Sequence, residues 1–247
     1  MTSAVLVRAI LFYLGLSLAT ILFLPISLLL YPFSLTLRFR VISKWALFNL
    51  WSLERVCGIN FEVEGRENIP AGAGIIMCKH QSAWETLALQ LVFPPQVWVL
   101  KRELLWIPVY GWALAGMQPI AIDRSSTLRA LREIVRQGTE RLRQGLWIVV
   151  FPEGTRMEPG TQGKYLPGGG MLAEKSGFPI VPVAHNSGYF WPKNSLRKWP
   201  GTIKMVVGPV IESRGRTATE ITRLVEEWIE DTVRTLPVPD HWAKRRV

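Results

Sequence analysis

The chain has 247 residues, of which 49% are hydrophobic and 19% are charged, and its formal net charge is +10. Because soluble domains carry about 25% charged residues, this composition excludes a disordered or fibrous chain and indicates that some apolar surface meets lipid. The basic excess fits nucleic acid, anionic lipid or a phosphorylated small molecule as a partner, and the two cysteines provide no disulfide framework.

An apolar stretch without charged residues runs from Ala9 to Leu37. As one straight helix it would be about 44 Å long, which exceeds the roughly 30 Å of a bilayer core. Pro25 and Pro32 interrupt it, so a kink or break is expected near Leu24. The stretch is longer than the apolar region of a signal peptide, so one spanning helix or a two-helix hairpin is expected, and the short halves favour the hairpin.

Basic residues follow this stretch more closely than they precede it. Arg38, Arg40 and Lys44 lie directly behind it, whereas Arg8 alone lies just before it. Because cytoplasmic flanks are enriched in Lys and Arg, we expect the rest of the chain on the cytoplasmic side of an inner membrane. Residues 1–52 are therefore predicted to be membrane-anchoring helices.

Residues 53–247 are expected to form one α/β domain. Helical periodicity is clearest in residues 128–142 and 221–229, whereas the three glycines at 168–170 are expected to form a loop. Short apolar runs bounded by glycine, proline or charge predict the strands Ile59–Val63, Gly74–Cys78, Val97–Leu100, Pro119–Ile122, Leu146–Phe151, Ile180–Ala184 and Ile203–Val207. This alternation predicts a mixed, mostly parallel sheet flanked by helices, with ligands bound beyond the carboxyl ends of the strands.

His80 follows one of these predicted strands, and Glu85 comes five positions later. Five helical positions turn about 500°, so the two side chains would not share one helical face. If His80 lies in the turn before the helix, Glu85 can reach back to Nδ1, which leaves Nε2 to take a proton from a substrate hydroxyl. The alternative is a structural histidine, because such a spacing is common by chance. Ser82 is disfavoured as a nucleophile, because the G-x-S-x-G pattern is absent around it.

A second candidate site is the sequence FPEGTR, residues 151–156, which follows an apolar strand directly. Gly154 permits a tight turn, Thr155 offers a hydroxyl, and Arg156 is a bidentate ligand for phosphate. Glu153 could bind a hydroxyl of the substrate. The alternative is a plain turn with a surface arginine.

Two further predicted strands end in basic residues. Lys101 and Arg102 end one of them, and Arg124 follows the other. Each alone is more readily explained as a solvated charge. Together with Arg156 they predict a positive rim for an anionic ligand.

The sequence VPVAHNSG, residues 181–188, contains a second histidine, His185. It could be a second base, but a packing or site-lining role is the simpler interpretation. Because neither an H-E-x-x-H string nor a C-x-x-C pair accompanies it, we expect no metal site.

Four strings occur in a fixed order: KHQSAWET, residues 100–124, FPEGTR and VPVAHNSG. In this combination the chain resembles the membrane-bound glycerolipid acyltransferases, and most closely the 1-acylglycerol-3-phosphate acyltransferases. The resemblance covers residues from about Gly65 to Val210, together with the apolar N-terminus. It implies transfer of an acyl group from acyl-CoA or acyl-carrier protein to the 2-hydroxyl of 1-acyl-sn-glycerol-3-phosphate, which yields phosphatidic acid without a cofactor or metal.

Other interpretations stay open at this point. The same chemistry could serve glycerol-3-phosphate, another lysophospholipid or a lyso-aminolipid as acceptor. A non-catalytic membrane protein that binds anionic lipid would share the charge and the apolar N-terminus, but it would have no need of the His80–Glu85 spacing. A nucleic-acid partner is not expected, because the basic residues match no recognised module.

The resemblance also implies roles for individual residues. His80 corresponds to the general base and Glu85 to the carboxylate that orients it, although the family more often has aspartate there. Glutamate keeps the charge and adds one methylene, so the pair stays chemically possible with a slightly different geometry. Pro182 corresponds to a proline linked with the acyl donor or with structure. The residues expected to bind the acceptor, chiefly through its phosphate, are Lys101, Arg124, Glu153, Gly154, Thr155 and Arg156.

Overall fold

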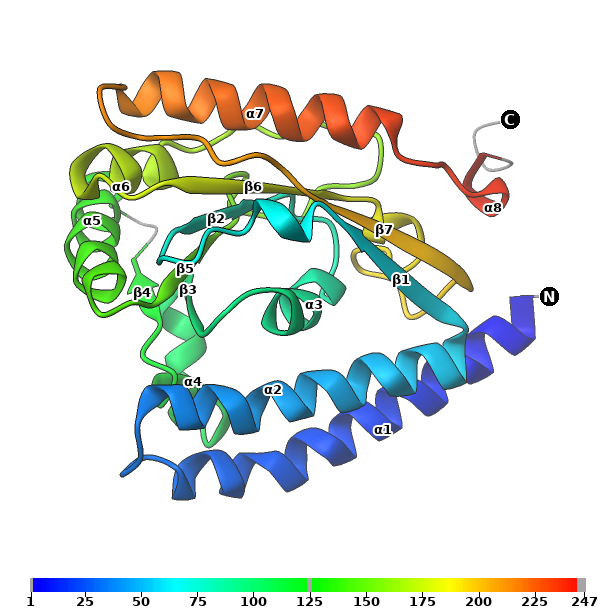
Figure 1. Cartoon of the computed structure of the whole chain (residues 1–247). Coiled ribbons are helices and arrows are strands. Elements are labelled where there is room, and N and C mark those ends of the chain that lie inside the picture. The colour runs from blue at the N-terminus through cyan, green and yellow to red at the C-terminus, as the bar shows by residue number, and fades with distance from the viewer. Residues whose placement is uncertain (1, 124–125, 244–247) are drawn as a thin grey trace.

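The structure is a computed structural model that describes residues 2–123 and 126–243. Within these residues seven strands form one sheet in the order β1-β7-β6-β2-β5-β3-β4 (Figure 1). All neighbouring strands are parallel except β6 and β7, so the predicted mixed, mostly parallel sheet is confirmed. The strands are β1 (Ile59–Glu64), β2 (Ile75–Cys78), β3 (Gln96–Lys101), β4 (Ile120–Ile122), β5 (Trp147–Val150), β6 (Ile180–His185) and β7 (Gly201–Val207).

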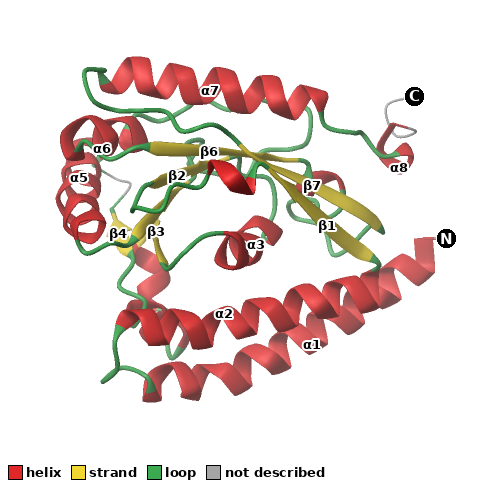
Figure 2. Ribbon diagram, viewed as in Figure 1, coloured by secondary structure: helices red, strands yellow, loops and turns green. Residues whose placement is uncertain are grey.

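Helices cover both faces of this sheet (Figure 2). One face carries α1 (Thr2–Leu29), α2 (Leu35–Ser52) and α3 (Trp84–Val92). The other carries α5 (Thr127–Arg143), α6 (Gly168–Ser176) and α7 (Ala218–Thr235). The remaining helical elements are α4 (Tyr110–Ala115), α8 (Asp240–Ala243), the π-helical η1 (Leu53–Cys57) and the 3-10 elements η2 (Arg66–Asn68), η3 (Arg102–Trp106) and η4 (Ser187–Tyr189).

The central strands β2, β5 and β6 are buried along their whole length. Strands buried on both faces consist of continuous apolar residues, which is why these three stand out in the sequence. Alternate residues of β2 face opposite sides of the sheet. Ile76 and Cys78 pack in the core beneath α2 and α3, whereas Ile75 and Met77 pack in the core beneath α5, α6 and α7.

α1 and α2 form an antiparallel hairpin, with the turn at residues 30–34 (Figure 1). Of the two expected arrangements, one spanning helix and a two-helix hairpin, the structure shows the hairpin. The chain does not break near Leu24, because α1 continues through Pro25, and the second helix begins only at Leu35. A proline removes one helical hydrogen bond and can bend a helix without ending it, and α1 is bowed. The chain reverses instead after Pro32, where the hydroxyl of Ser34 accepts an N–H of the first turn of α2.

The outer side of α1 is apolar and exposed. Residues Ser3–Leu29 have a mean hydropathy of 2.3 and are long and apolar enough to cross a membrane. Leu14, Ile21 and Leu29 are each more than half exposed to solvent. An apolar surface of this kind indicates association with a membrane.

The three glycines at 168–170, expected to form a loop, instead begin α6. Their lack of side chains lets this helix approach its neighbours closely. A Cβ atom on Gly169 would lie 2.7 Å from the sulfur of Met77, and one on Gly170 would lie 2.5 Å from the carbonyl oxygen of Ala218. The run is therefore a packing feature of the second layer.

Candidate active site

His80 lies just beyond the carboxyl end of β2, at the centre of the sheet, and before α3. Its main chain is held on both sides by the segment that follows β5. The N–H of His80 donates to Glu153 Oε2 at 3.1 Å, and its carbonyl accepts the N–H of Met157 at 2.7 Å. The histidine is therefore in the turn before the helix, as the five-residue spacing required.

The side chains of His80 and Glu85 form a hydrogen bond, with 2.8 Å between Nδ1 and Oε1. The Glu85 carboxylate is fully buried, and both of its oxygens accept further hydrogen bonds. The N–H groups of Gln81 and Ser82 donate to Oε1 at 2.9 Å each. The hydroxyls of Ser82 and Ser187 donate to Oε2 at 2.6 and 3.1 Å.

This arrangement keeps Glu85 ionised. Burial acts to raise its pKa, but the neighbouring His185 and the hydrogen bonds from His80 and Ser82 lower the pKa to about 2. An ionised Glu85 makes Nδ1 the protonated nitrogen of a neutral His80. Nε2 has no hydrogen-bond partner among the described residues, so its lone pair is available to accept a proton.

The longer glutamate fits because it folds back over the turn. Glu85 lies in the first turn of α3, where the free N–H groups of a helix start favour a negative charge. Its carboxylate accepts the N–H groups of Gln81 and Ser82, in the turn before the helix, and two hydroxyls, in addition to its contact with His80. The departure from aspartate is thus compensated locally.

The ring of His80 is also fixed in its plane. It stacks on Phe151, with 3.9 Å between ring centroids and 15° between planes. Only 17% of the His80 side chain is exposed. The imidazole is therefore held in one orientation, and His80 lines the cavity described next.

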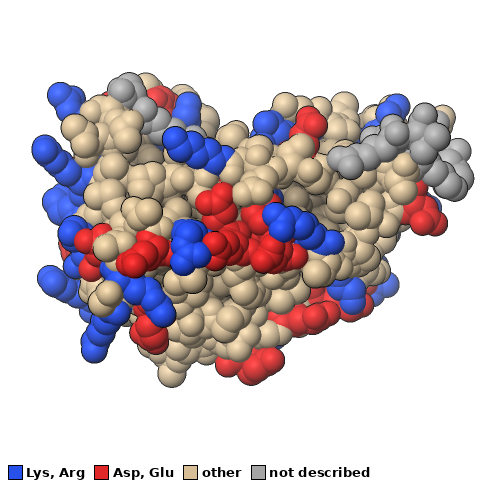
Figure 3. Space-filling model, turned by 90° about the horizontal axis from the view of Figure 1, so that it is seen from above, with Lys and Arg blue, Asp and Glu red and all other residues tan. Residues whose placement is uncertain are grey.

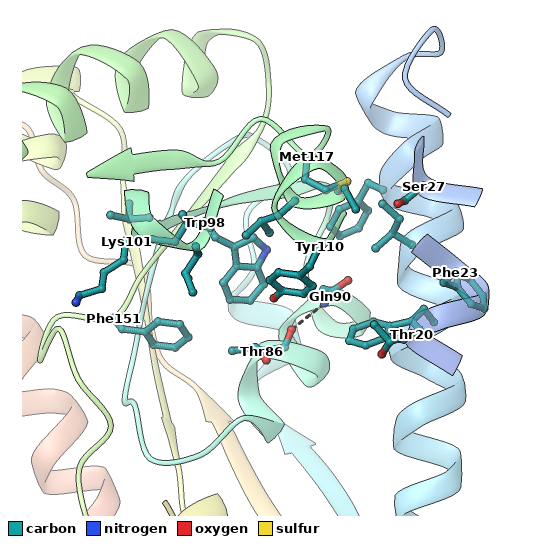
Figure 4. A pocket seen from close by; sticks show the side chains of 18 of the residues that line it. Thr20, Phe23, Ser27, Thr86, Gln90, Trp98, Lys101, Tyr110, Met117 and Phe151 are labelled. Atoms are coloured by element: carbon teal, nitrogen blue, oxygen red, sulfur yellow. Dashed lines mark hydrogen bonds between the residues drawn. The ribbon is translucent and has the colours of Figure 1, made fainter. Parts of the chain in front are cut away.

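His80 opens onto a cavity of about 560 Å³ that lies between the N-terminal hairpin, α3, β3 and α4. Figure 4 shows Lys101 and Phe151 toward one side and Phe23 of α1 toward the other, with the rings of Trp98 and Tyr110 between them. The hairpin wall consists of Thr20, Phe23, Leu24, Ser27, Phe39, Ile42 and Trp45. Such a mostly apolar space with a few polar groups at one end fits a lipid-like ligand.

The predicted cationic rim is present in part. Gly154, Thr155 and Arg156 line the cavity together with His80, and Lys101 lines it from the end of β3. The guanidinium of Arg156 forms no ion pair with a described residue, which leaves it open to an anionic ligand. Arg124 lies outside the described residues.

A model of the acyltransferase family matches residues 60–186, which is more than half of the chain. The chain belongs to this acyltransferase family. Over 233 residues the acyltransferase is 44% identical to the 1-acyl-sn-glycerol-3-phosphate acyltransferase of Pseudomonas aeruginosa, a match that covers 92% of this chain and 90% of the relative. It is 32% identical over 182 residues to human 1-acyl-sn-glycerol-3-phosphate acyltransferase alpha, covering 72% of this chain and 64% of the relative.

The fold is shared with a solved structure, the 1-acyl-sn-glycerophosphate (LPA) acyltransferase PlsC from Thermotoga maritima. The TM-score is 0.77 at 22% identity, over 94% of this chain and 99% of that one. The acyltransferase is therefore an enzyme, and the interpretation as a non-catalytic lipid-binding protein is set aside.

Two predicted site residues of the acyltransferase lie away from the cavity lining. The Glu153 carboxylate, expected to contact the acceptor, is buried and accepts the ammonium of Lys79 at 2.7 Å and the N–H of His80. Pro182 is buried in β6 beside Met77 of β2, and its carbonyl accepts the N–H of Gly208 at 2.8 Å. Both surroundings favour a structural role over ligand contact.

The sequence did not single out two further residues of the acyltransferase site: Lys79, which binds Glu153, and Ser187, which binds Glu85. Lys79 is fully buried and Ser187 binds Glu85 from a distant part of the chain. Lys79 is next to His80 in the string KHQSAWET, and Ser187 is two positions after His185 in VPVAHNSG, so closeness in sequence to a candidate histidine could have pointed to them. His185 is a packing residue: burial lowers its pKa, and its Nε2 donates to the carbonyl of Lys79 at 2.7 Å.

No group of three or more His, Cys, Asp or Glu side chains among the residues the structure describes could hold a metal ion. Ser82 has no exposed surface and its hydroxyl is engaged by Glu85, so it is not placed to attack a substrate.

Proposed function

We propose that this acyltransferase transfers an acyl group from acyl-CoA or acyl-carrier protein to the 2-hydroxyl of 1-acyl-sn-glycerol-3-phosphate, which yields phosphatidic acid. One observation carries the proposal. His80, whose Nε2 has no hydrogen-bond partner among the residues that the structure describes, lines an apolar cavity together with Arg156 and Lys101, so a base, a phosphate ligand and space for an acyl chain adjoin one another. The names of the relatives support the same acceptor.

In the proposed mechanism His80 acts as general base. Nε2 accepts the proton of the 2-hydroxyl as its oxygen attacks the thioester carbonyl, and the ionised Glu85 stabilises the imidazolium that forms. Collapse of the tetrahedral intermediate expels the thiolate, which takes the proton back from His80. Every atom and proton is then accounted for without an acyl-enzyme, a metal or a cofactor.

Binding would be divided between the two ends of the cavity. Arg156 and Lys101 would hold the phosphate, with Arg124 as the third cation that the family resemblance implies. The apolar wall of α1, α2 and α4 would hold an acyl chain. Exclusion of water there would protect the thioester from hydrolysis by the same base.

We propose that the hairpin anchors the enzyme in the inner membrane with the catalytic part on the cytoplasmic side, residues 1–52 being the anchor and 53–247 the acyltransferase domain. The exposed apolar side of α1 and the basic residues that follow the apolar stretch support this placement. Membrane lipid would then be the immediate surroundings of the acceptor.

The test uses purified full-length enzyme in detergent with a panel of acceptors and two donors, an acyl-CoA and an acyl-carrier-protein thioester. 1-Acyl-sn-glycerol-3-phosphate should be preferred to glycerol-3-phosphate, other lysophospholipids and a lyso-aminolipid. His80→Ala should lose nearly all turnover while it remains folded. Unchanged turnover in His80→Ala would refute the mechanism, and preference for another acceptor would refute the assigned substrate.

A further inference from the structure

A buried cluster of charged residues lies behind His80, on the side away from the cavity. Lys79, whose side chain has no exposed surface, donates to Glu153 Oε1 and to Glu230 Oε1 at 2.7 Å each. Its third contact is the carbonyl of Thr161 at 3.3 Å, so all three N–H groups of the ammonium are used. The hydroxyl of Tyr165 donates to the same oxygen of Glu230 at 2.8 Å.

This cluster joins three parts of the chain that are distant in sequence. Lys79 follows β2, Glu153 follows β5, and Glu230 lies on the inner side of α7. α7 crosses the far layer of the molecule (Figure 1), and its outer face carries a row of exposed charges (Figure 3). Glu230 lies beyond residues 60–186, the part that the family model matches.

The segment from Glu153 to Met157 brackets His80. Glu153 accepts the N–H of His80, and Met157 donates to its carbonyl. Arg156 lies between these two anchors. The same short segment therefore fixes the position of His80 relative to Arg156, the residue proposed to bind phosphate. The position of the segment depends in turn on the Glu153 carboxylate.

We propose that Lys79 and Glu230 are positioning residues for acyl transfer: Glu230 of α7 holds the Lys79 ammonium, which holds Glu153, and Glu153 fixes both the main chain of His80 and the segment that carries Arg156. This inference rests on the proposed general-base role of His80. The ammonium of Lys79 fixes geometry because each of its three N–H groups has a partner, so withdrawing one carboxylate leaves a buried N–H without a hydrogen bond. The second layer of the enzyme therefore takes part in the reaction without touching the substrate.

The test compares two substitutions of Glu230, one that changes the charge of the side chain and one that changes its length. Glu230→Gln keeps an oxygen within reach of Lys79 and Tyr165 but loses the charge. Glu230→Asp keeps the charge but withdraws it by one methylene. Because a misplacement of about 1 Å costs on the order of 100-fold in rate, kcat/KM of Glu230→Asp should fall by up to about 100-fold, and Glu230→Gln should stay closer to wild type.

The kinetic constants distinguish positioning from mere loss of folded enzyme. Fewer folded molecules lower the apparent kcat and leave the acceptor KM unchanged, whereas a displaced segment lowers kcat and raises the acceptor KM together. Glu227→Gln is the matched control, because Glu227 is exposed on the same helix and pairs only with Arg223 in the part of the chain that the structure describes. It should behave as wild type.

Wild-type constants in both Glu230 variants, or a lower kcat with an unchanged acceptor KM, would overturn the inference. His80→Ala, measured in the same assay, distinguishes a failure of the general-base mechanism from a failure of the positioning role. If His80→Ala keeps its turnover, the general-base mechanism fails. If it loses turnover while Glu230→Asp keeps wild-type constants, only the positioning role fails.

Discussion

The hydroxyl of Ser187, just beyond the end of β6, lies 3.1 Å from Oε2 of Glu85, in the first turn of α3. The two residues are 102 positions apart in the chain. Through this contact the strand that ends in His185 supports the carboxylate of the proposed catalytic dyad. The orientation of His80 therefore depends on β6 as well as on its own turn.

Replacement of Glu85 tests the dyad directly. Glu85→Gln should lower kcat by on the order of 10³ to 10⁴-fold, because an amide can donate to Nδ1 and so stabilise the wrong tautomer of His80. Glu85→Asp keeps the charge and should retain more activity than Glu85→Gln. Steady-state kinetics with a thiol-release assay would measure both, and equal activity of Glu85→Gln and wild type would contradict the assigned role.

The dyad should also make stability depend on pH. The pKa of Glu85 is about 2 in the folded protein against an ordinary value of 4.5, so its ionised form stabilises the fold above about pH 4.5. That contribution, on the order of 3 kcal/mol, should be lost as the pH falls from about 4.5 to 2. Thermal unfolding in detergent between these limits should show a steeper loss for wild type than for Glu85→Gln, and parallel curves would contradict the prediction.

Arg156 should affect binding more than chemistry. Arg156→Ala should raise the acceptor KM by about 10 to 100-fold, equivalent to losing a charge-assisted hydrogen bond of about 1.5–3 kcal/mol, with a smaller change in kcat. The donor KM should stay within about twofold of wild type, because Arg156 is assigned to the acceptor phosphate. A change confined to the donor KM would reassign this residue.

The cavity should limit the length of the acyl chain. Ala113 of α4 lines it, so Ala113→Phe should remove space and shift preference toward shorter chains. Ala115→Phe is the matched control, because Ala115 lies on the same helix and is exposed. A competition among thioesters of graded chain length would measure the preference, and an identical profile for the two variants would place the chain elsewhere.

Two tryptophans near the cavity should contact the membrane. Trp106 is 70% exposed and Trp112 is 56% exposed, which is unusual for so apolar a side chain. Replacing either by Ser should weaken binding to liposomes by on the order of 10-fold, since burial of a large apolar side chain contributes about 1.5 kcal/mol or more. Leu128→Ser on α5, which is 70% exposed, should leave flotation with liposomes unchanged.

Much of this architecture could be predicted because its determinants are local. Each predicted apolar run forms a strand, because strands buried on both faces, such as β2 and β5, must be apolar throughout. The contact between His80 and Glu85 spans one turn, so the spacing together with the other motifs predicted it, although the spacing by itself is common by chance. Pro25 misled because a proline inside a helix can bend the helix without ending it.

The contacts that hold the site residues in place could not be predicted, because they join residues that are far apart in the sequence. Glu153 has the residue type of an acceptor ligand, but the sequence does not show that Lys79, 74 positions away, draws its carboxylate inward. Glu230 is 151 positions from Lys79 and resembles its exposed neighbours on α7. Side-chain direction, unlike residue type, is set by the packing of the whole fold.

Four residues of α1, the helix suited to the membrane, also form part of the wall of the cavity beside His80: Thr20, Phe23, Leu24 and Ser27. An acyl tail that slides between bilayer and cavity exchanges one apolar phase for another and avoids exposure to water, which costs about 0.8 kcal/mol per methylene. The rate should then follow the mole fraction of acceptor in the lipid surface rather than its bulk concentration. Deleting α1 to obtain a soluble enzyme would remove the anchor and part of the reaction chamber together.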